Sequence, residues 1–421
     1  MDKKLALVLL ISVLFGAYAA EIYTQYGYGL RDVKERPSGY DDRSAIEISG
    51  DLRIEKIRAF PYIFFRGHQI VSDGGGRGKS IFSENGQEFS PLGFISNATT
   101  VLCNEIGKWQ IYTSDEHGFN NPKGIWGQKN IDILALGDSF THGSCVDPKN
   151  HMIGKIRASY PLTINLGRLG TGPLFQLAAL REYGPELKPK TVLWFILEDN
   201  DIDGDLHDEL TIPALTKYMD AGYTQNLISR QVAIDTHLTD YIDQNFVNWL
   251  DIAKRQRETG TKVAPWLGTD KAFEKKSKAA PLFGLNWNKI KNALRLQNVR
   301  NSLGISSVRG RKKIRLQKLY GEFENILFEA QKTVGTWNGK LQIIYLAGPT
   351  RYHSWRQKNV RDYQHGKLMQ IFERQKLPVI DIVAEFENEI DPFSLFYGHY
   401  SPKGYGIVSE RVLEALDTRP E

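Results

Sequence analysis

Four groups of polar residues in this sequence carry the side chains and backbone groups needed for chemistry on an acyl compound. Ser139 follows a short apolar run, Asn200 follows another, and His399 lies near the carboxyl end of the chain. A glycine-containing stretch, Gly167 to Gly170, lies between the serine and the asparagine. A serine hydroxyl, amide donors and a distant imidazole are the parts of acyl transfer: a nucleophile, an oxyanion hole and a general base.

The elements that must position these residues alternate between strands and helices. Apolar runs of strand length lie at 131–136, 161–166, 191–197, 341–347 and 379–383. Helical patterns separate them, and we expect the helix that starts at Leu174 to stop at Gly184-Pro185. This rhythm predicts an α/β fold with a parallel sheet. Because ligands bind beyond the carboxyl ends of such strands, the sheet would gather the four groups along one edge.

The polar groups also resemble four sequence blocks of a known family. Gly137 to Gly143 (GDSFTHG) looks like the first block of the SGNH (GDSL) hydrolases, and Asn165 to Gly170 resembles the second. Glu198 to Asp201 is similar to the third, and Gly398-His399 to the last. The segment Asp115 to Pro122 looks like exported members of this family. The four blocks occur in the family's order and on the expected elements.

The resemblance implies a flavodoxin-like, three-layer α/β/α SGNH domain and a role for each matched residue. Ser139 would be the nucleophile and His399 the base that takes its proton. The backbone N–H groups of Ser139 and Gly170 and the side-chain amide of Asn200 would form the oxyanion hole. Asp138 and Asp201 would fix loops by hydrogen bonds. The family needs no cofactor, and no metal site is expected here.

The third member of the triad is where the sequence departs from the family. An aspartate usually lies three residues before the histidine, and that position is Phe396. Either Asp391, the nearest upstream aspartate, orients His399, or a backbone carbonyl does and the site is a Ser-His dyad. Glu198 replaces the glycine of the third block, and His142 is the main rival base.

The chain contains two cysteines, Cys103 and Cys145. We expect them to form a disulfide, because Cys145 lies just after the candidate serine and the protein is expected to be exported. The alternative is two separate buried thiols.

Three domains are expected. In residues 1–20, Lys3-Lys4 is followed by a short apolar stretch. This order favours a cleaved signal peptide over an uncleaved N-terminal anchor. Residues 21–129 form a β-rich N-terminal region, and 130–421 form the hydrolase domain. A helical insertion at about 203–318 ends in a basic segment that is either a solvated face or a surface for an anionic polymer or lipid headgroups. The protein could associate with a membrane surface through its N-terminal segment or through this basic insertion.

The function expected is an exported serine esterase that cleaves an acyl ester, for example an O-acetyl group on a carbohydrate. The alternatives are an O-acyltransferase that uses the same residues on an extracytoplasmic polysaccharide, and a catalytically silent binding protein. A net charge of +5 gives no indication of nucleic-acid binding. The expected location is periplasmic, secreted or membrane-anchored, and the oligomeric state is left open.

Overall fold

The computed structural model describes residues 3–22, 39–66, 69–70, 82–84, 86–259, 294–296, 299, 310–353 and 355–417. Its centre is a five-stranded sheet in the order β12-β11-β10-β8-β9, and every neighbouring pair is parallel. The strands are β8 (Ile133–Leu136), β9 (Thr163–Asn165), β10 (Thr191–Leu197), β11 (Lys340–Leu346) and β12 (Val379–Asp381). This is the flavodoxin-like order, so the predicted α/β class and parallel sheet are confirmed.

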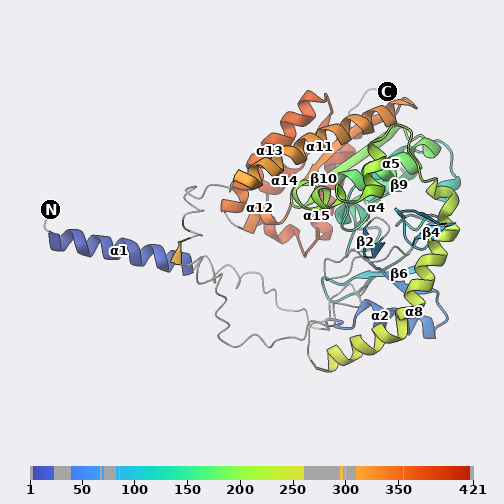
Figure 1. Cartoon of the computed structure of the whole chain (residues 1–421), viewed down its shortest axis with the longest axis horizontal. Coiled ribbons are helices and arrows are strands. Elements are labelled where there is room, and N and C mark those ends of the chain that lie inside the picture. The colour runs from blue at the N-terminus through green and yellow to red at the C-terminus, as the bar shows by residue number, and fades with distance from the viewer. Residues whose placement is uncertain are drawn as a thin grey trace.

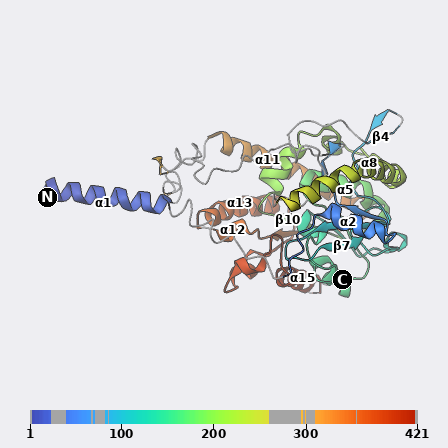
Figure 2. The same cartoon turned by 90° about the horizontal axis from the view of Figure 1, so that it is seen from below.

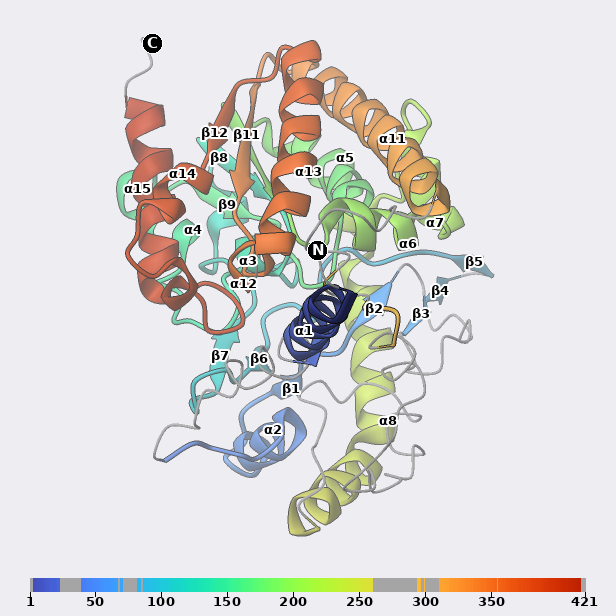
Figure 3. The same ribbon diagram turned by 90° about the vertical axis from the view of Figure 1, so that its left-hand side faces the viewer.

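Helices cover both faces of this sheet (Figure 3). On one face α4 packs against α15, and on the other α11 packs against α5 and α13. The helices are α4 (Met152–Ser159), α5 (Pro173–Leu187), α11 (Gly310–Gly335), α13 (Trp355–Arg374) and α15 (Pro402–Asp417). Because both faces are covered, the strands are buried along almost their whole length, which accounts for their continuous apolar runs.

Helix α5 does not stop where the sequence suggested. It continues through Gly184 and Pro185 and ends at Leu187, where Lys188 adopts a left-handed conformation. Gly184 lies against Trp337, and a Cβ atom there would come within 3.0 Å of that ring. Burial of Gly184 and Leu187 in the last turn therefore outweighs the poor helix propensity of Gly184 and Pro185. The expectation of a stop at Gly184-Pro185 was wrong.

From residue 39 to β8, the described chain is built from short strands, loops, one α-helix and one 3-10 turn. Helix α2 (Ala45–Ile54) begins with a capping box between Ser44 and Glu47. A three-stranded sheet combines β1 (Ala59–Pro61), β6 (Thr99–Cys103) and β7 (Gln110–Thr113). Two small hairpins pair β2 (Phe65–Arg66) with β3 (Gln69–Ile70) and β4 (Ser83–Glu84) with β5 (Gln87–Glu88). Its buried aromatic side chains other than Trp109 belong to the same core cluster as the strands of the large sheet.

The insertion after β10 starts with short helical turns. They are a π-helical turn (Asp201–Leu206), α6 (His207–Glu209), α7 (Pro213–Thr216) and two 3-10 turns (Lys217–Met219, Leu227–Arg230). The long helix α8 (Gln231–Glu258) then runs beside α2 (Figure 1). Arg53 of α2 pairs with Asp243 and stacks on Phe246, 4.0 Å from the ring centre. Most of the predicted basic segment lies outside the described residues.

Helix α1 (Lys3–Ile22) extends away from the body of the protein (Figures 1 and 2). Apolar side chains along it are exposed, Phe15 and Val13 among them. Within the described part of the chain, no helix combines the length and the apolar character needed to cross a membrane. The remaining short elements are α3 (Ser139–His142), α12 (Thr350–His353), α14 (Val383–Glu387) and 3-10 turns at Ile125–Gly127 and Pro392–Leu395.

Candidate active site

Ser139 lies where β8 passes into α3, at the carboxyl edge of the sheet. The strand ends at Leu136, and the side chain of Asp138 caps the helix by accepting the N–H of Phe140 at 2.9 Å. Ser139 is therefore the first residue of the helix, and it is partly exposed. This placement presents its hydroxyl to solvent on a fixed backbone.

His399 comes from the loop before α15 and reaches the same point. Its Nε2 lies 2.9 Å from Oγ of Ser139, although the two residues are 260 positions apart in the chain. The ring of Phe140 packs against the imidazole, with the ring centres 4.9 Å apart. The two side chains predicted to act together are thus within hydrogen-bond distance.

Glu105, from the N-terminal region, holds the other side of the imidazole. Its Oε1 lies 2.6 Å from Nδ1 of His399, and its Oε2 accepts the backbone N–H groups of Gly398 and His399 at 3.0 and 2.9 Å. Burial raises the pKa of Glu105, but the hydrogen bonds from His399 and Gly398 outweigh it, and the pKa lies below its usual value. Glu105 is therefore a carboxylate at neutral pH.

The prediction that Asp391 orients His399 was wrong. Asp391 is exposed at the start of a 3-10 turn, where its carbonyl accepts the N–H of Ser394. The family position, Phe396, is buried between Phe386 and Tyr400, so a carboxylate there would lie in an aromatic cluster. The dyad alternative does not fit either, because Nδ1 faces the Glu105 carboxylate and not a carbonyl.

These contacts determine the tautomer that His399 needs as a base. Because a carboxylate can only accept, Nδ1 carries the proton and Nε2 is free to accept the hydroxyl proton of Ser139. The rival base, His142, is buried, and burial lowers its pKa to about 3. Its Nε2 faces Tyr112 Oη at 3.3 Å instead of Ser139.

Two predicted oxyanion donors are backbone N–H groups. Among the described residues, neither the N–H of Ser139 nor that of Gly170 has an acceptor. Gly170 has φ +66°, a conformation that favours glycine, and a Cβ there would come within 2.6 Å of the Phe64 ring. The N-terminal region thus closes one side of the site.

The third predicted donor, Asn200, follows β10, the neighbour of β8 in the sheet. Its side-chain amide donates to Oδ2 of Asp205. A carboxamide has two N–H donors, so this contact uses one of them. The neighbouring Asp201 accepts the N–H of Leu197 at 2.9 Å, which is the loop-fixing role expected of it.

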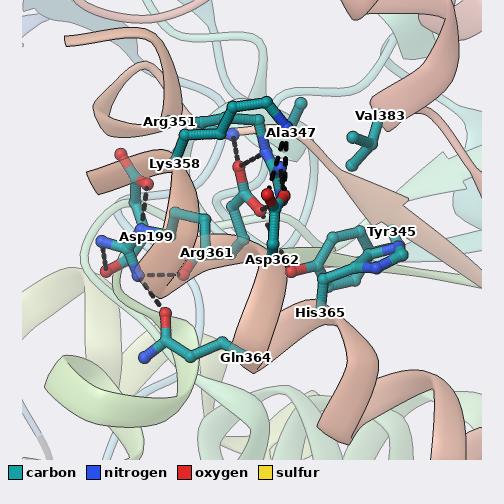
Figure 4. Close-up of polar contacts among 12 residues, drawn as sticks. Asp199, Tyr345, Ala347, Arg351, Lys358, Arg361, Asp362, Gln364, His365 and Val383 are labelled. Carbon is teal, nitrogen blue, oxygen red and sulfur yellow. Dashed lines mark hydrogen bonds and ion pairs between the residues drawn. The ribbon is translucent and has the colours of Figure 1, made fainter. Parts of the chain in front are cut away.

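The loop that carries Asn200 is tied down by ion pairs with α12 and α13 (Figure 4). Arg351 binds Glu198 through two nitrogens, at 2.9 and 2.7 Å, and both side chains are buried. Arg361 donates to the backbone carbonyls of Glu198 and Asp199. The glutamate that departs from the family's third block is therefore a structural anchor, and it adds no acid to the site.

The predicted disulfide is confirmed: Cys103 and Cys145 are bonded. The Sγ atom of Cys145 lies 4.0 Å from Nδ1 of His399. Glu105, Cys145 and His399 cluster closely enough to hold a metal ion. Because a disulfide sulfur is not a thiolate, however, this cluster lacks the ligand that its cysteine would supply.

Glu105 is the residue of the candidate site that sequence reasoning missed. It matches no motif, and it is 294 positions from His399. The available signal was its place two residues after Cys103, since a bridge to Cys145 would carry it toward Ser139.

Comparisons with known proteins add little to this geometry. No protein-family model matches the chain, and no curated protein matches it. Similar solved structures include a lipolytic protein of the G-D-S-L family from Veillonella parvula, with 13% identity, 68% of this chain and 99% of that chain covered, and a TM-score of 0.32. A catalytic mutant of an acetylxylan esterase from Geobacillus stearothermophilus is 12% identical. The match covers 69% of this chain and 96% of that chain, with a TM-score of 0.35. An esterase from Pseudoalteromonas is 9% identical. The match covers 68% of this chain and 97% of that chain, with a TM-score of 0.31. At these values the likeness says nothing about activity.

Proposed function

We propose that this protein is a serine esterase with the triad Ser139, His399 and Glu105. The observation that carries the proposal is the chain of contacts from Oγ to Nε2 at 2.9 Å and from Nδ1 to the carboxylate at 2.6 Å. The side chains of His399 and Glu105 are 23% and 20% exposed, so the chain of contacts reaches solvent.

The residues divide the reaction among them. His399 takes the proton of Ser139 as the hydroxyl oxygen attacks the ester carbonyl, and Glu105 stabilises the imidazolium that forms. The imidazolium then gives its proton to the leaving alcohol, which leaves an acyl-enzyme on Ser139. A water molecule activated by His399 attacks this acyl group and releases the acid.

The negative charge of the tetrahedral intermediate needs donors that are already in place. The N–H groups of Ser139 and Gly170 and the remaining N–H of Asn200 supply them in this proposal. One such donor is typically worth about 3–4 kcal/mol of transition-state stabilisation. Arg351 and Arg361 support this function by fixing the loop before Asn200.

The substrate class we propose is a short acyl ester, an O-acetyl group on a carbohydrate. The Phe64 ring against Gly170 narrows the space beside the N–H that would face the reacting carbonyl. We also propose that the protein works outside the cytoplasm, in the periplasm, secreted, or anchored by its N-terminal segment. The disulfide supports this location, because such bonds persist in oxidising compartments.

The test is labelling with a fluorophosphonate followed by peptide mapping, together with turnover of p-nitrophenyl acetate and an acetylated polysaccharide. We expect the label on Ser139 and no turnover above background in Ser139→Ala. Labelling elsewhere, or equal turnover in the variant, would contradict the proposal. Acetyl groups transferred to an added polysaccharide acceptor, with no acetate released, would identify a transferase.

A further inference from the structure

The triad acid comes from a different part of the molecule than the nucleophile and the base. Ser139 and His399 stand on segments that follow or precede elements of the large sheet domain, whereas Glu105 lies just past β6 in the N-terminal region. Its neighbour Asn104 bonds to the carbonyl of Asp41 and the N–H of Gly107, both in that region. The acid must therefore be held against His399 across the contact between two regions.

The disulfide crosses this contact at the site itself. Cys103 is the last residue of β6 and lies two positions before Glu105, and Cys145 follows α3, the helix that begins with Ser139. The crosslink thus joins the segment that contains Glu105 to the segment that contains Ser139. The Sγ of Cys145 also lies 4.0 Å from Nδ1, the atom that Glu105 binds.

The backbone of Cys145, at the end of the crosslink next to the site, has an unusual conformation. Cys145 has φ +64°, a left-handed conformation that residues with a side chain rarely adopt. Such backbone geometry persists where the surrounding structure requires it, and it clusters at functional sites.

We propose that the Cys103–Cys145 disulfide is a positioning element of the active site, which holds the Glu105 carboxylate on Nδ1 of His399. This inference rests on the proposed function. It adds that the crosslink contributes to turnover beyond its contribution to stability, and that it does so only through Glu105.

A double-mutant cycle tests this dependence. Cys103→Ser/Cys145→Ser, Glu105→Gln and the triple variant are compared for kcat/KM on p-nitrophenyl acetate, well below each melting temperature. The serine pair should lower kcat/KM by up to about 100-fold in the wild-type background, as a misplacement of about 1 Å in a catalytic group can do. In the Glu105→Gln background it should cause no further loss. Equal losses in both backgrounds would overturn the inference.

A matched control separates positioning from stability. Val101→Ala removes buried side-chain volume from the same strand, β6, without touching the crosslink. This variant should lose stability and keep its kcat/KM at temperatures where it is folded. If Val101→Ala loses as much activity as the serine pair, the effect is general loosening of β6 and the inference is wrong.

A crystal structure of Cys103→Ser/Cys145→Ser gives a readout that does not depend on turnover. We expect Glu105 Oε1 to have left hydrogen-bond distance of Nδ1. If the 2.6 Å contact persists, the inference is overturned even though the esterase proposal stands. If the contact is lost but the wild type neither labels nor hydrolyses esters, the esterase proposal fails and the contribution to turnover fails with it; only the structural part, that the crosslink holds Glu105 against His399, stands.

Discussion

Two glutamates just past the ends of strands bind nitrogen-containing side chains, and the comparison between them separates catalysis from structure. Glu105 follows β6 and contacts His399, whose side chain is 23% exposed. Glu198 follows β10 and contacts Arg351, and these side chains are 0% and 1% exposed. Arg351 carries a permanent charge and cannot exchange a proton, whereas an imidazole can. The accessible pair can therefore take part in proton transfer, and the buried pair can only hold a loop.

Glu105→Gln breaks the accessible pair and should have the largest effect. A glutamine that donates to Nδ1 would favour the tautomer whose Nε2 already carries a proton, so His399 could no longer accept from Ser139. We expect kcat to fall by about 10⁴-fold with the fold intact, as for a triad aspartate replaced by its amide. Steady-state kinetics and circular dichroism measure both. Asp391→Asn is the control and should leave kcat unchanged; a loss there of similar size would reinstate Asp391.

Arg351→Met breaks the buried pair. It leaves the Glu198 carboxylate without its cation in a dry site, which typically costs about 3–5 kcal/mol of stability. Urea unfolding should show this loss. The double variant Glu198→Gln/Arg351→Met should recover much of it, because no buried charge remains unpaired. A double variant no more stable than Arg351→Met would show that Arg351 acts mainly through Asp362 and Glu387, its other partners.

Gly398→Ala sharpens the comparison without changing any charge. A Cβ atom at residue 398 would overlap Oε1 of Glu105 and push the carboxylate away from His399. We expect kcat to fall by up to about 100-fold, because a displacement of about 1 Å in a catalytic group can cost that much. Gly366→Ala, on α13 with no atom within 4 Å of the added methyl group, is the control and should retain full activity. Unchanged kinetics in Gly398→Ala would mean that the carboxylate has room to adjust.

Asp138 extends the comparison to a buried carboxylate that forms no ion pair with the residues the structure describes, and it should give the smallest effect. Burial raises the pKa of Asp138 from its ordinary value of 3.8 to about 7, so the native state holds a proton that the unfolded chain has already released. The stability that this proton contributes is complete at low pH and is lost as pH rises toward 7. The melting temperature of Asp138→Asn should therefore gain on that of the wild type between pH 5 and 8. A constant difference over this range would contradict the raised pKa.

The elements of the sheet could be predicted because their signals are local. Strand β10 has the same bounds as the apolar run at 191–197. Ser139 and Asn200 each lie just after the carboxyl end of a strand, β8 and β10, as predicted. Glu105 had no such signal, because its role depends on two regions meeting in space. Asp391 was chosen for its closeness to His399 in sequence, and that closeness says little about a loop that contains a buried Phe396.

The N-terminal contribution also determines how far the chain can be shortened. Phe64 and Glu105 both precede the large sheet, while Ser139 and His399 belong to the segment that contains it. In the proposed esterase, a fragment trimmed to the sheet and its covering helices would keep Ser139 and His399 but lose Glu105 and the ring beside Gly170. If the proposal holds, the smallest active fragment should therefore begin no later than Phe64, and a domain boundary drawn near residue 130 would separate the proposed acid from the proposed nucleophile and base.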